Sequence, residues 1–234
     1  MAGAEHDVTR IEAFSDAVFG FAITLLVVSL AVPNSFDELL QVMEGLPVFA
    51  VTFAILLMMW QEHHNLFKRF PSSDGPTIWL NGALLFVMLS YIYPLKFLFS
   101  GIVGPAGMRF GQSTTFIRFD QMMTLMLVYG AGFAAIFLLF AVMYWRASRR
   151  VTDPVSRHDA RVLLGHSFVY VGVAALSMTL AVLGGNYASA YSGVAYGMVG
   201  PCQGLHHGLA RRYWKPPVPA AVITPAEGAP QALS

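Results

Sequence analysis

The sequence has few charged residues and a single cysteine. Charged residues make up 12% of the 234 positions and hydrophobic residues 56%, whereas soluble domains are about one quarter charged. This excess of apolar residues is too large for one core inside a water-facing shell, and it also excludes a disordered chain. Cys202 alone cannot form a disulfide framework. No basic stripe is interleaved with aromatic residues, so nucleic acid is not an expected partner. The composition predicts a polytopic membrane protein.

Six segments of the chain are long and apolar enough to be membrane spans, which need roughly 20 residues to cross ~30 Å of hydrocarbon. The sixth is rich in Gly, Ala and Ser, which suits a helix packed closely among others. We expect Pro94 to kink the third. Together they predict an all-α transmembrane domain over residues 1–215, followed by a disordered Pro/Ala-rich tail over 216–234. The expected spans are 11–32, 45–67, 77–100, 121–145, 161–183 and 187–205.

The basic residues predict the orientation of these spans. If the N-terminus is cytoplasmic and six spans alternate, all but three of the 14 Lys and Arg residues fall on the cytoplasmic side, as the positive-inside rule requires. The exceptions are Lys96, Arg109 and Arg118, and the first outside loop carries acidic residues with no basic residue. Both termini are therefore expected in the cytoplasm.

Polar residues from three spans are expected at one membrane depth. Asp16 lies inside the first span, where a carboxylate costs ~2.5–3.5 kcal/mol and needs partners. We predict a buried hydrogen-bonded network near the cytoplasmic face, in which Asp16 and Ser15 meet Arg10, a histidine and Asn81. Two alternatives remain open: each group caps a helix or extends to the interface, or Asp16 and a histidine relay protons. The residues expected at this site are Arg10, Phe14, Ser15, Asp16, Trp60, His63, His64 and Asn81.

No metal site or catalytic centre is expected from the sequence. His63-His64 and the group Cys202, His206 and His207 do not make a complete four-ligand pattern. No G-x-S-x-G elbow or H-E-x-x-H pair is present, so neither a nucleophile nor a metal base can be named. The sequence therefore predicts that the protein is not an enzyme and has no cofactor.

The first span carries a motif, Arg10-x-x-x-Phe14-Ser15-Asp16, followed by an apolar run that ends Ala-Ile-Thr-Leu-Leu at residues 22–26. This motif closely resembles the first-helix signature of the transmembrane protein 175 family, the potassium channels of animal endolysosomes and of bacteria. The looser resemblance extends over the six-span body, including the end of the second span, and does not cover the tail.

The resemblance implies a potassium-selective channel without a carbonyl filter, and no T-V-G-Y-G segment occurs here. It implies that the first helix lines the pore, with Ile23 as the tightest ring, Val27 and Leu30 above it, and Thr24 and Ser29 as supporting hydroxyls. Helical spacing places Asp16, Gly20, Ile23, Val27, Leu30 and Asn34 on one face. From spacing alone, the opposite face serves equally well: Phe19, Ala22, Leu26, Ser29 and Pro33.

The resemblance also implies an assembly, because the signature occurs once in this chain. Bacterial family members with one six-span repeat form tetramers, so a homotetramer in a bacterial plasma membrane is expected, with potassium as the permeant ion. The expected partners are other copies of the chain and the lipid bilayer, with no other protein implied. The alternative is a proton- or ion-coupled transporter that uses Asp16 and His63 or His64, but the inverted repeats common in such proteins are not visible.

Overall fold

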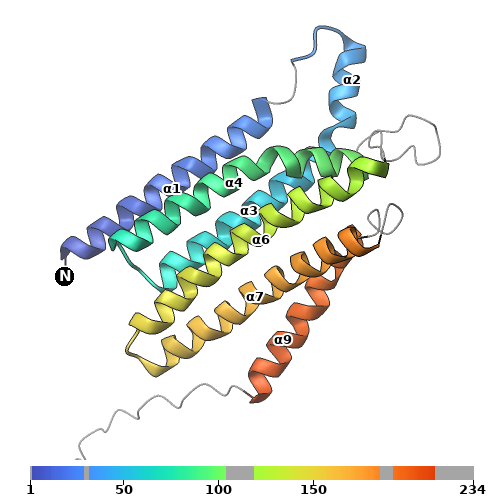
Figure 1. Cartoon of the computed structure of the whole chain (residues 1–234). Coiled ribbons are helices and arrows are strands. Elements are labelled where there is room, and N and C mark those ends of the chain that lie inside the picture. The colour runs from blue at the N-terminus through green and yellow to red at the C-terminus, as the bar shows by residue number, and fades with distance from the viewer. Residues whose placement is uncertain (1, 29–31, 104–118, 185–191, 214–234) are drawn as a thin grey trace, which may run out of the picture.

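The computed structural model describes residues 2–28, 32–103, 119–184 and 192–213, and all regular structure in these ranges is helical. This confirms the all-α prediction for the described part of the chain. Figure 1 shows the helices as a bundle of long rods with one short helix at one end. The elements are α1 (Ala2–Val28), α2 (Phe36–Glu44), α3 (Leu46–Arg69), α4 (Gly75–Ile102), α6 (Phe119–Arg150), α7 (Pro154–Leu183), the 3-10 helix η1 (Ser192–Met198) and α9 (Val199–Tyr213).

Five described helices are long and apolar enough to cross a membrane, and they correspond to the first five predicted spans. Their apolar stretches are Arg10–Val28, Leu46–Arg69, Gly75–Gly101, Gln121–Arg150 and Pro154–Leu183. The described part of the predicted sixth span is η1 followed by the start of α9, and neither is among these five. The sixth span therefore stays a prediction, and the predicted tail lies outside the described residues. α4 continues without a break through Pro94, where the sequence predicts a kink.

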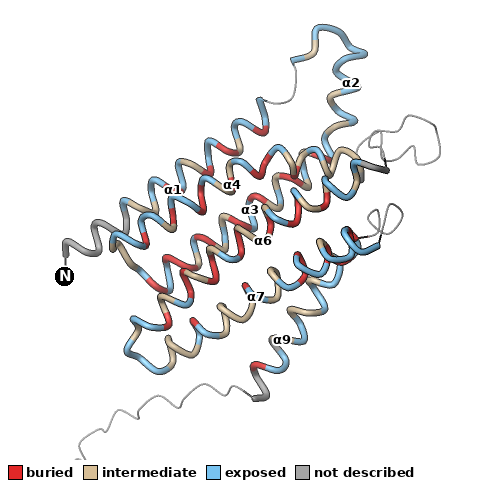
Figure 2. Tube along the Cα trace, viewed as in Figure 1, coloured by how far each residue is buried: buried red, intermediate tan, exposed pale blue. Residues whose placement is uncertain are grey.

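The core of the subunit lies between α3, α4 and α6, where Figure 2 shows most of the buried positions. Its largest fully buried side chains include Leu84 of α4 and Ile136 and Phe140 of α6. α6 and α4 approach closely at Gly132, because a Cβ at this glycine would collide with the Tyr91 ring. The Tyr91 hydroxyl donates a hydrogen bond of 3.1 Å to the Tyr129 carbonyl oxygen. α7 packs along α6, and α9 returns along α7.

The short helix α2 was not predicted; the sequence analysis treats this segment as an outside loop. Its first turn is nevertheless encoded locally. Ser35 is the N-cap and its hydroxyl accepts a hydrogen bond of 3.2 Å from the Glu38 backbone N–H, while the Glu38 carboxylate accepts one of 2.7 Å from the Asn34 backbone N–H. The first bond is one half of a capping box, and the Glu38 carboxylate caps the residue before the N-cap instead of the N-cap itself. None of the side chains of α2 is buried.

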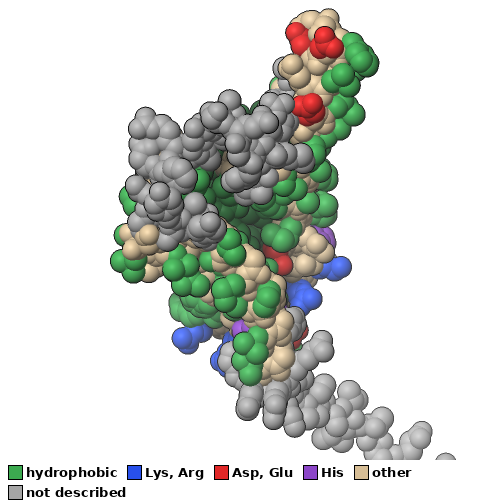
Figure 3. All heavy atoms as spheres, turned by 90° about the vertical axis from the view of Figure 1, so that its right-hand side faces the viewer, with side chains coloured by type: hydrophobic (Ala, Val, Ile, Leu, Met, Phe, Trp, Pro, Cys, Tyr) green, Lys and Arg blue, Asp and Glu red, His purple; other side chains and the backbone are tan. Residues whose placement is uncertain are grey.

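Charged side chains are separated along the long axis of the molecule. In Figure 3 the acidic side chains gather mainly at the end formed by α2, and the basic ones lie toward the opposite end. The α2 end carries Asp37 and Glu38, while the opposite end carries Lys68 and Arg69 at the end of α3 and Arg149 and Arg150 at the end of α6. This polarity matches the charge distribution that the sequence predicts for two different sides of a membrane.

Candidate functional site

A chain of hydrogen bonds joins α1, α3 and α4 near the basic end of the bundle. The Asn81 Nδ2 of α4 donates to Ser15 Oγ of α1 at 2.9 Å, and Asn81 Oδ1 lies 2.7 Å from His63 Nε2 of α3. Ser15 Oγ in turn donates to the Ile11 carbonyl oxygen at 2.9 Å. Because an amide oxygen only accepts, His63 donates from Nε2. Every link therefore has a donor and an acceptor.

The members of this chain are almost completely buried. Ser15 is 0% exposed, His63 1% and Asn81 3%. The His63 ring also lies between two aromatic rings, with centroid distances of 5.7 Å to Phe19 and 4.8 Å to Phe67. A polar group buried in this way is costly unless it is hydrogen-bonded, so the closed chain of donors and acceptors explains how three polar side chains fit inside an apolar bundle.

Asp16 takes part in a separate contact with α3. Its Oδ1 accepts a hydrogen bond of 2.7 Å from Trp60 Nε1, and the Trp60 ring stacks on His64 with centroids 5.6 Å apart. Asp16 and His64 are both exposed in the single subunit. The predicted members of the polar site therefore divide into a buried group around Asn81 and an exposed group around Trp60.

Two of the predicted residues do not join either group. Arg10 is exposed, and among the described residues no hydrogen bond or ion pair links it to Asp16. Phe14 is 61% exposed and points away from the core. No three His, Cys, Asp or Glu side chains lie close enough to hold a metal ion in the part of the chain that the structure describes.

The faces of α1 differ in their contacts within the subunit. Phe19, Ala22 and Leu26 are buried against the core and continue the line begun by Ser15. These three residues belong to the face that spacing alone offered as an alternative pore lining. This part of that face therefore packs within the chain itself.

The face implied by the resemblance remains largely open. Val27 is 48% exposed, Gly20 and Thr24 are also exposed, and Ile23 is partly exposed, since one side of Ile23 packs against the core. Thr24 Oγ1 donates to the Phe21 carbonyl oxygen at 2.7 Å. Ser29 and Leu30, which complete the predicted set, lie outside the described residues.

A second polar cluster, which was not predicted from the sequence, joins the turn before α4 to the end of α6. Asp74 accepts from Arg146 Nη2 at 2.8 Å and binds Arg150 through both carboxylate oxygens. Ser72 Oγ donates to Asp74 at 2.7 Å and accepts from Arg150 at 2.6 Å. The bound Arg150 guanidinium holds the pKa of the Asp74 carboxyl well below its usual range, with help from the Thr77 and Ser72 hydroxyls.

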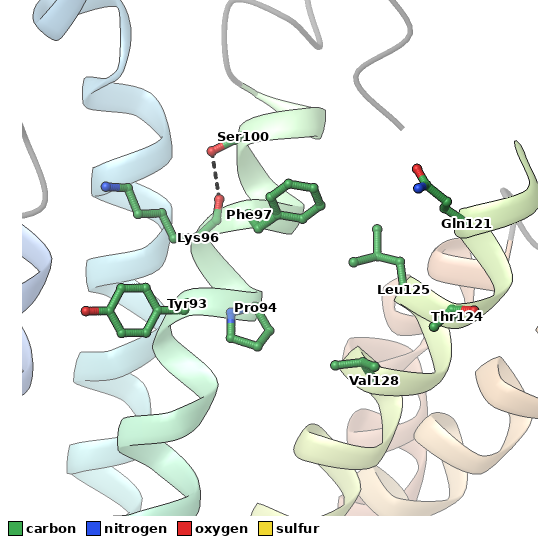
Figure 4. Close-up of a pocket in the computed structure, with 9 residues that line it drawn as sticks. All are labelled: Tyr93, Pro94, Lys96, Phe97, Ser100, Gln121, Thr124, Leu125 and Val128. Carbon is green, nitrogen blue, oxygen red and sulfur yellow. Dashed lines mark hydrogen bonds between the residues drawn. The ribbon is translucent and has the colours of Figure 1, made fainter. Parts of the chain in front are cut away.

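A large open cavity lies at the other end of the bundle, between the second half of α4 and the start of α6. Its volume is about 860 Å³. Figure 4 shows Pro94 and Phe97 of α4 opposite Leu125 and Val128 of α6, with Ser100 and Gln121 at the same end of the cavity. None of its lining residues belongs to the predicted polar site or to the predicted pore face.

Comparison with known proteins places these features in a family. Residues 10–92, which carry both polar groups described above for α1, α3 and α4, match the sequence model of the family described as endosomal/lysosomal potassium channel TMEM175. The crystal structure of a variant of the potassium channel MtTMEM175, bound to a nanobody–MBP fusion protein, is similar with a TM-score of 0.73 and 32% identity, over 87% of this chain and 93% of that chain. The chain belongs to the TMEM175 family. The resemblance stated from the first-span motif is thereby confirmed.

Two further proteins are similar to this chain. A potassium channel of Marivirga tractuosa is 45% identical over 145 residues, and this match spans 59% of this chain and 59% of that protein. The crystal structure of a lysosomal potassium-selective channel TMEM175 homolog from Chamaesiphon minutus has a TM-score of 0.56 at 24% identity, over 88% of this chain and 98% of that chain. This second structure supports the fold alone. Family membership also agrees with the expectation that the protein is not an enzyme.

Proposed function

We propose that this protein is a potassium channel of the bacterial plasma membrane. Family membership carries the proposal: MtTMEM175 and the Marivirga protein are both named potassium channels. Neither is described as a coupled transporter, which was the alternative drawn from Asp16 and the histidines. The five long apolar helices suit a multi-pass protein. Potassium is then the permeant ion, and no cofactor is required.

The proposed pore is formed by α1 from four copies of the chain. α1 uses one stripe for its own subunit, through Phe19, Ala22 and Leu26, and leaves the face of Gly20, Ile23 and Val27 wholly or partly open. Four copies arranged around an axis would turn this face toward a central passage, and closed cyclic assemblies are the usual solution for identical subunits. The proposed orientation has six spans and both termini in the cytoplasm.

The proposed selectivity element is the constriction of Ile23, with Val27 and Leu30 above it and the Thr24 and Ser29 hydroxyls behind. A narrow apolar ring excludes a strongly hydrated ion more than a weakly hydrated one, and it closes by losing its water. Potassium gives up water more readily than sodium, so such a ring favours potassium. The Thr24 hydroxyl is already bonded to the Phe21 carbonyl oxygen, so its proposed role is to orient this part of the helix.

An ion-flux measurement tests the channel proposal directly. Purified protein in liposomes should pass potassium down its own gradient and should pass sodium more slowly. The potassium flux should not require a proton gradient. A flux that depends on an imposed proton gradient would favour the transporter alternative. Equal permeation of potassium and sodium would leave a channel but contradict the proposed apolar selectivity element.

A further inference from the structure

A basic cavity lies at the opposite end of the bundle from α2, next to the Asp74 cluster. Its volume is about 320 Å³. It is bounded by the end of α3, the turn before α4, the end of α6 and the start of α7. Its polar lining includes three arginines and three hydroxyls, and its apolar lining includes Phe67, Phe70 and Met143. The polar lining residues are Arg69, Arg146, Arg150, Ser72, Thr77 and Ser156.

The residues that line this cavity carry more positive than negative charge. Three guanidinium groups line it, and Asp74 is the carboxylate bonded to two of them, Arg146 and Arg150. Asp153, the N-cap of α7, is bonded to the Ser156 backbone N–H and hydroxyl, at 2.8 and 2.7 Å. Glu62 acts on Arg69 through space and does not line the cavity. The lining therefore carries an excess of positive charge next to an apolar wall.

The guanidinium of Arg146 is only partly used by Asp74. Arg146 Nε is buried and has no hydrogen-bond partner among the described residues, although Nη2 of the same side chain binds Asp74. Buried donors in native structures are nearly always paired with protein, water or a ligand. Guanidinium groups match the geometry of phosphate oxygens, which they bind through two parallel N–H groups.

We propose that this cavity binds a phosphate group, with the guanidinium groups of Arg69, Arg146 and Arg150 as its donors. The source that the position favours is the headgroup of an anionic phospholipid, because the cavity adjoins the ends of the apolar helices and has apolar side chains on one wall. Basic pockets at the cytoplasmic ends of spans are suited to such headgroups. The proposal concerns lipid binding and does not depend on which ion the protein passes.

The test compares two arginine variants of the full chain in detergent. Arg69→Gln removes a lining charge without breaking the Asp74 cluster. Arg149→Gln removes the same charge outside the cavity. The Arg149 guanidinium lies over the Trp145 ring, 5.6 Å from its centroid. Binding of phosphatidylglycerol, phosphatidylcholine and inorganic phosphate is measured at constant ionic strength through the shift in thermal unfolding midpoint. We expect Arg69→Gln to weaken phosphatidylglycerol binding about fivefold, and Arg149→Gln to leave it within about twofold.

A third variant separates charge from geometry. Arg146→Lys keeps the positive charge beside Asp74 but lacks the planar guanidinium, and it should weaken binding about tenfold, since the parallel N–H groups that match phosphate oxygens are lost. Stabilisation by phosphatidylglycerol but not by inorganic phosphate assigns the site to a lipid headgroup, and competition by inorganic phosphate assigns it to a free anion. Equal losses in Arg69→Gln and Arg149→Gln, or equal binding of phosphatidylcholine, would overturn the proposal.

Discussion

The Asn81 side chain holds Ser15 of α1 and His63 of α3 together, with hydrogen bonds of 2.9 and 2.7 Å on its two ends. One amide on α4 therefore fixes the relative positions of three helices. All three side chains are buried, and Ser15 and His63 lie on the two helices that the Trp60–Asp16 hydrogen bond also joins. The position of α1, the proposed pore helix, depends on this joint.

Replacing Asn81 with leucine should destabilise the subunit. The leucine fills a similar volume but leaves Ser15 Oγ and His63 Nε2 with one partner fewer, at a cost of about 1–3 kcal/mol for each buried group left unsatisfied. The thermal unfolding midpoint in detergent measures the effect. Ser90→Ala is the control, since Ser90 is an exposed serine of α4 bonded only within its own helix. Equal midpoints for the two variants would mean that the amide does not hold the helices together.

Two substitutions of Asp16 separate its charge from its hydrogen bond. Asp16→Asn keeps an oxygen acceptor for Trp60 but removes the charge, while Asp16→Ala removes both. We expect Asp16→Asn to impair tetramer assembly or channel opening, and to change the ratio of potassium to sodium permeability less. Size-exclusion chromatography and liposome flux measure these properties. Normal assembly and currents in Asp16→Asn would contradict a role for the charge, and a defect restricted to Asp16→Ala would assign the role to the hydrogen bond.

The proposed constriction predicts different results for the same substitution at two residues of α1. Ile23→Asn should increase ion flux and reduce discrimination against sodium, because a polar ring no longer excludes hydrated ions. Leu25→Asn introduces the same side chain two residues away, on another exposed part of α1, and should leave the permeability ratio unchanged. The ratio of potassium to sodium flux is measured in liposomes for both variants. An unchanged ratio in Ile23→Asn would show that another face lines the pore.

The Asp74 cluster predicts a loss of stability in acid. The pKa of Asp74 is lowered in the folded protein by the bound Arg150, so the stabilisation is fully present above the unfolded value of about 3.9 and is lost as the pH falls below it. Thermal midpoints recorded between neutral pH and about pH 3 should therefore fall at the acid end. The fall should be smaller in Asp74→Asn, which starts from a lower midpoint at neutral pH. Parallel curves for the two proteins would contradict this role.

The five long helices could be predicted because membrane spans are encoded by length and hydropathy, which need no tertiary information. α2 was missed for the opposite reason: it is short, and none of its side chains is buried. The local signal was present nonetheless, in the spacing of Ser35 and Glu38. Serine followed three residues later by glutamate is a helix-start signal even where the helix is short.

The polar site could be predicted only in part. The topology brings the end of α3 and the start of α4 to the same depth as Ser15, but it does not say which of two adjacent histidines faces inward. Successive residues on a helix point about 100° apart, and the structure turns His63 to the core and His64 outward. The partner of Asp16 is Trp60 rather than Arg10, and the contacts of Asp74 with α6 span more than 70 residues, which no local pattern encodes.

The pairing of Asp74 with Arg146 and Arg150 bears on how the chain is inserted into the membrane. During insertion, orientation is set by Lys and Arg near the ends of spans, while acidic residues contribute little. In the proposed orientation, both arginines therefore count as positive charges that keep their end of α6 in the cytoplasm during insertion. Asp74, although it is synthesised before them, does not cancel this effect. In the folded protein the same side chains bind Asp74 and so join the turn before α4 to the end of α6. In that orientation, residues that first direct insertion become tertiary contacts in the finished protein.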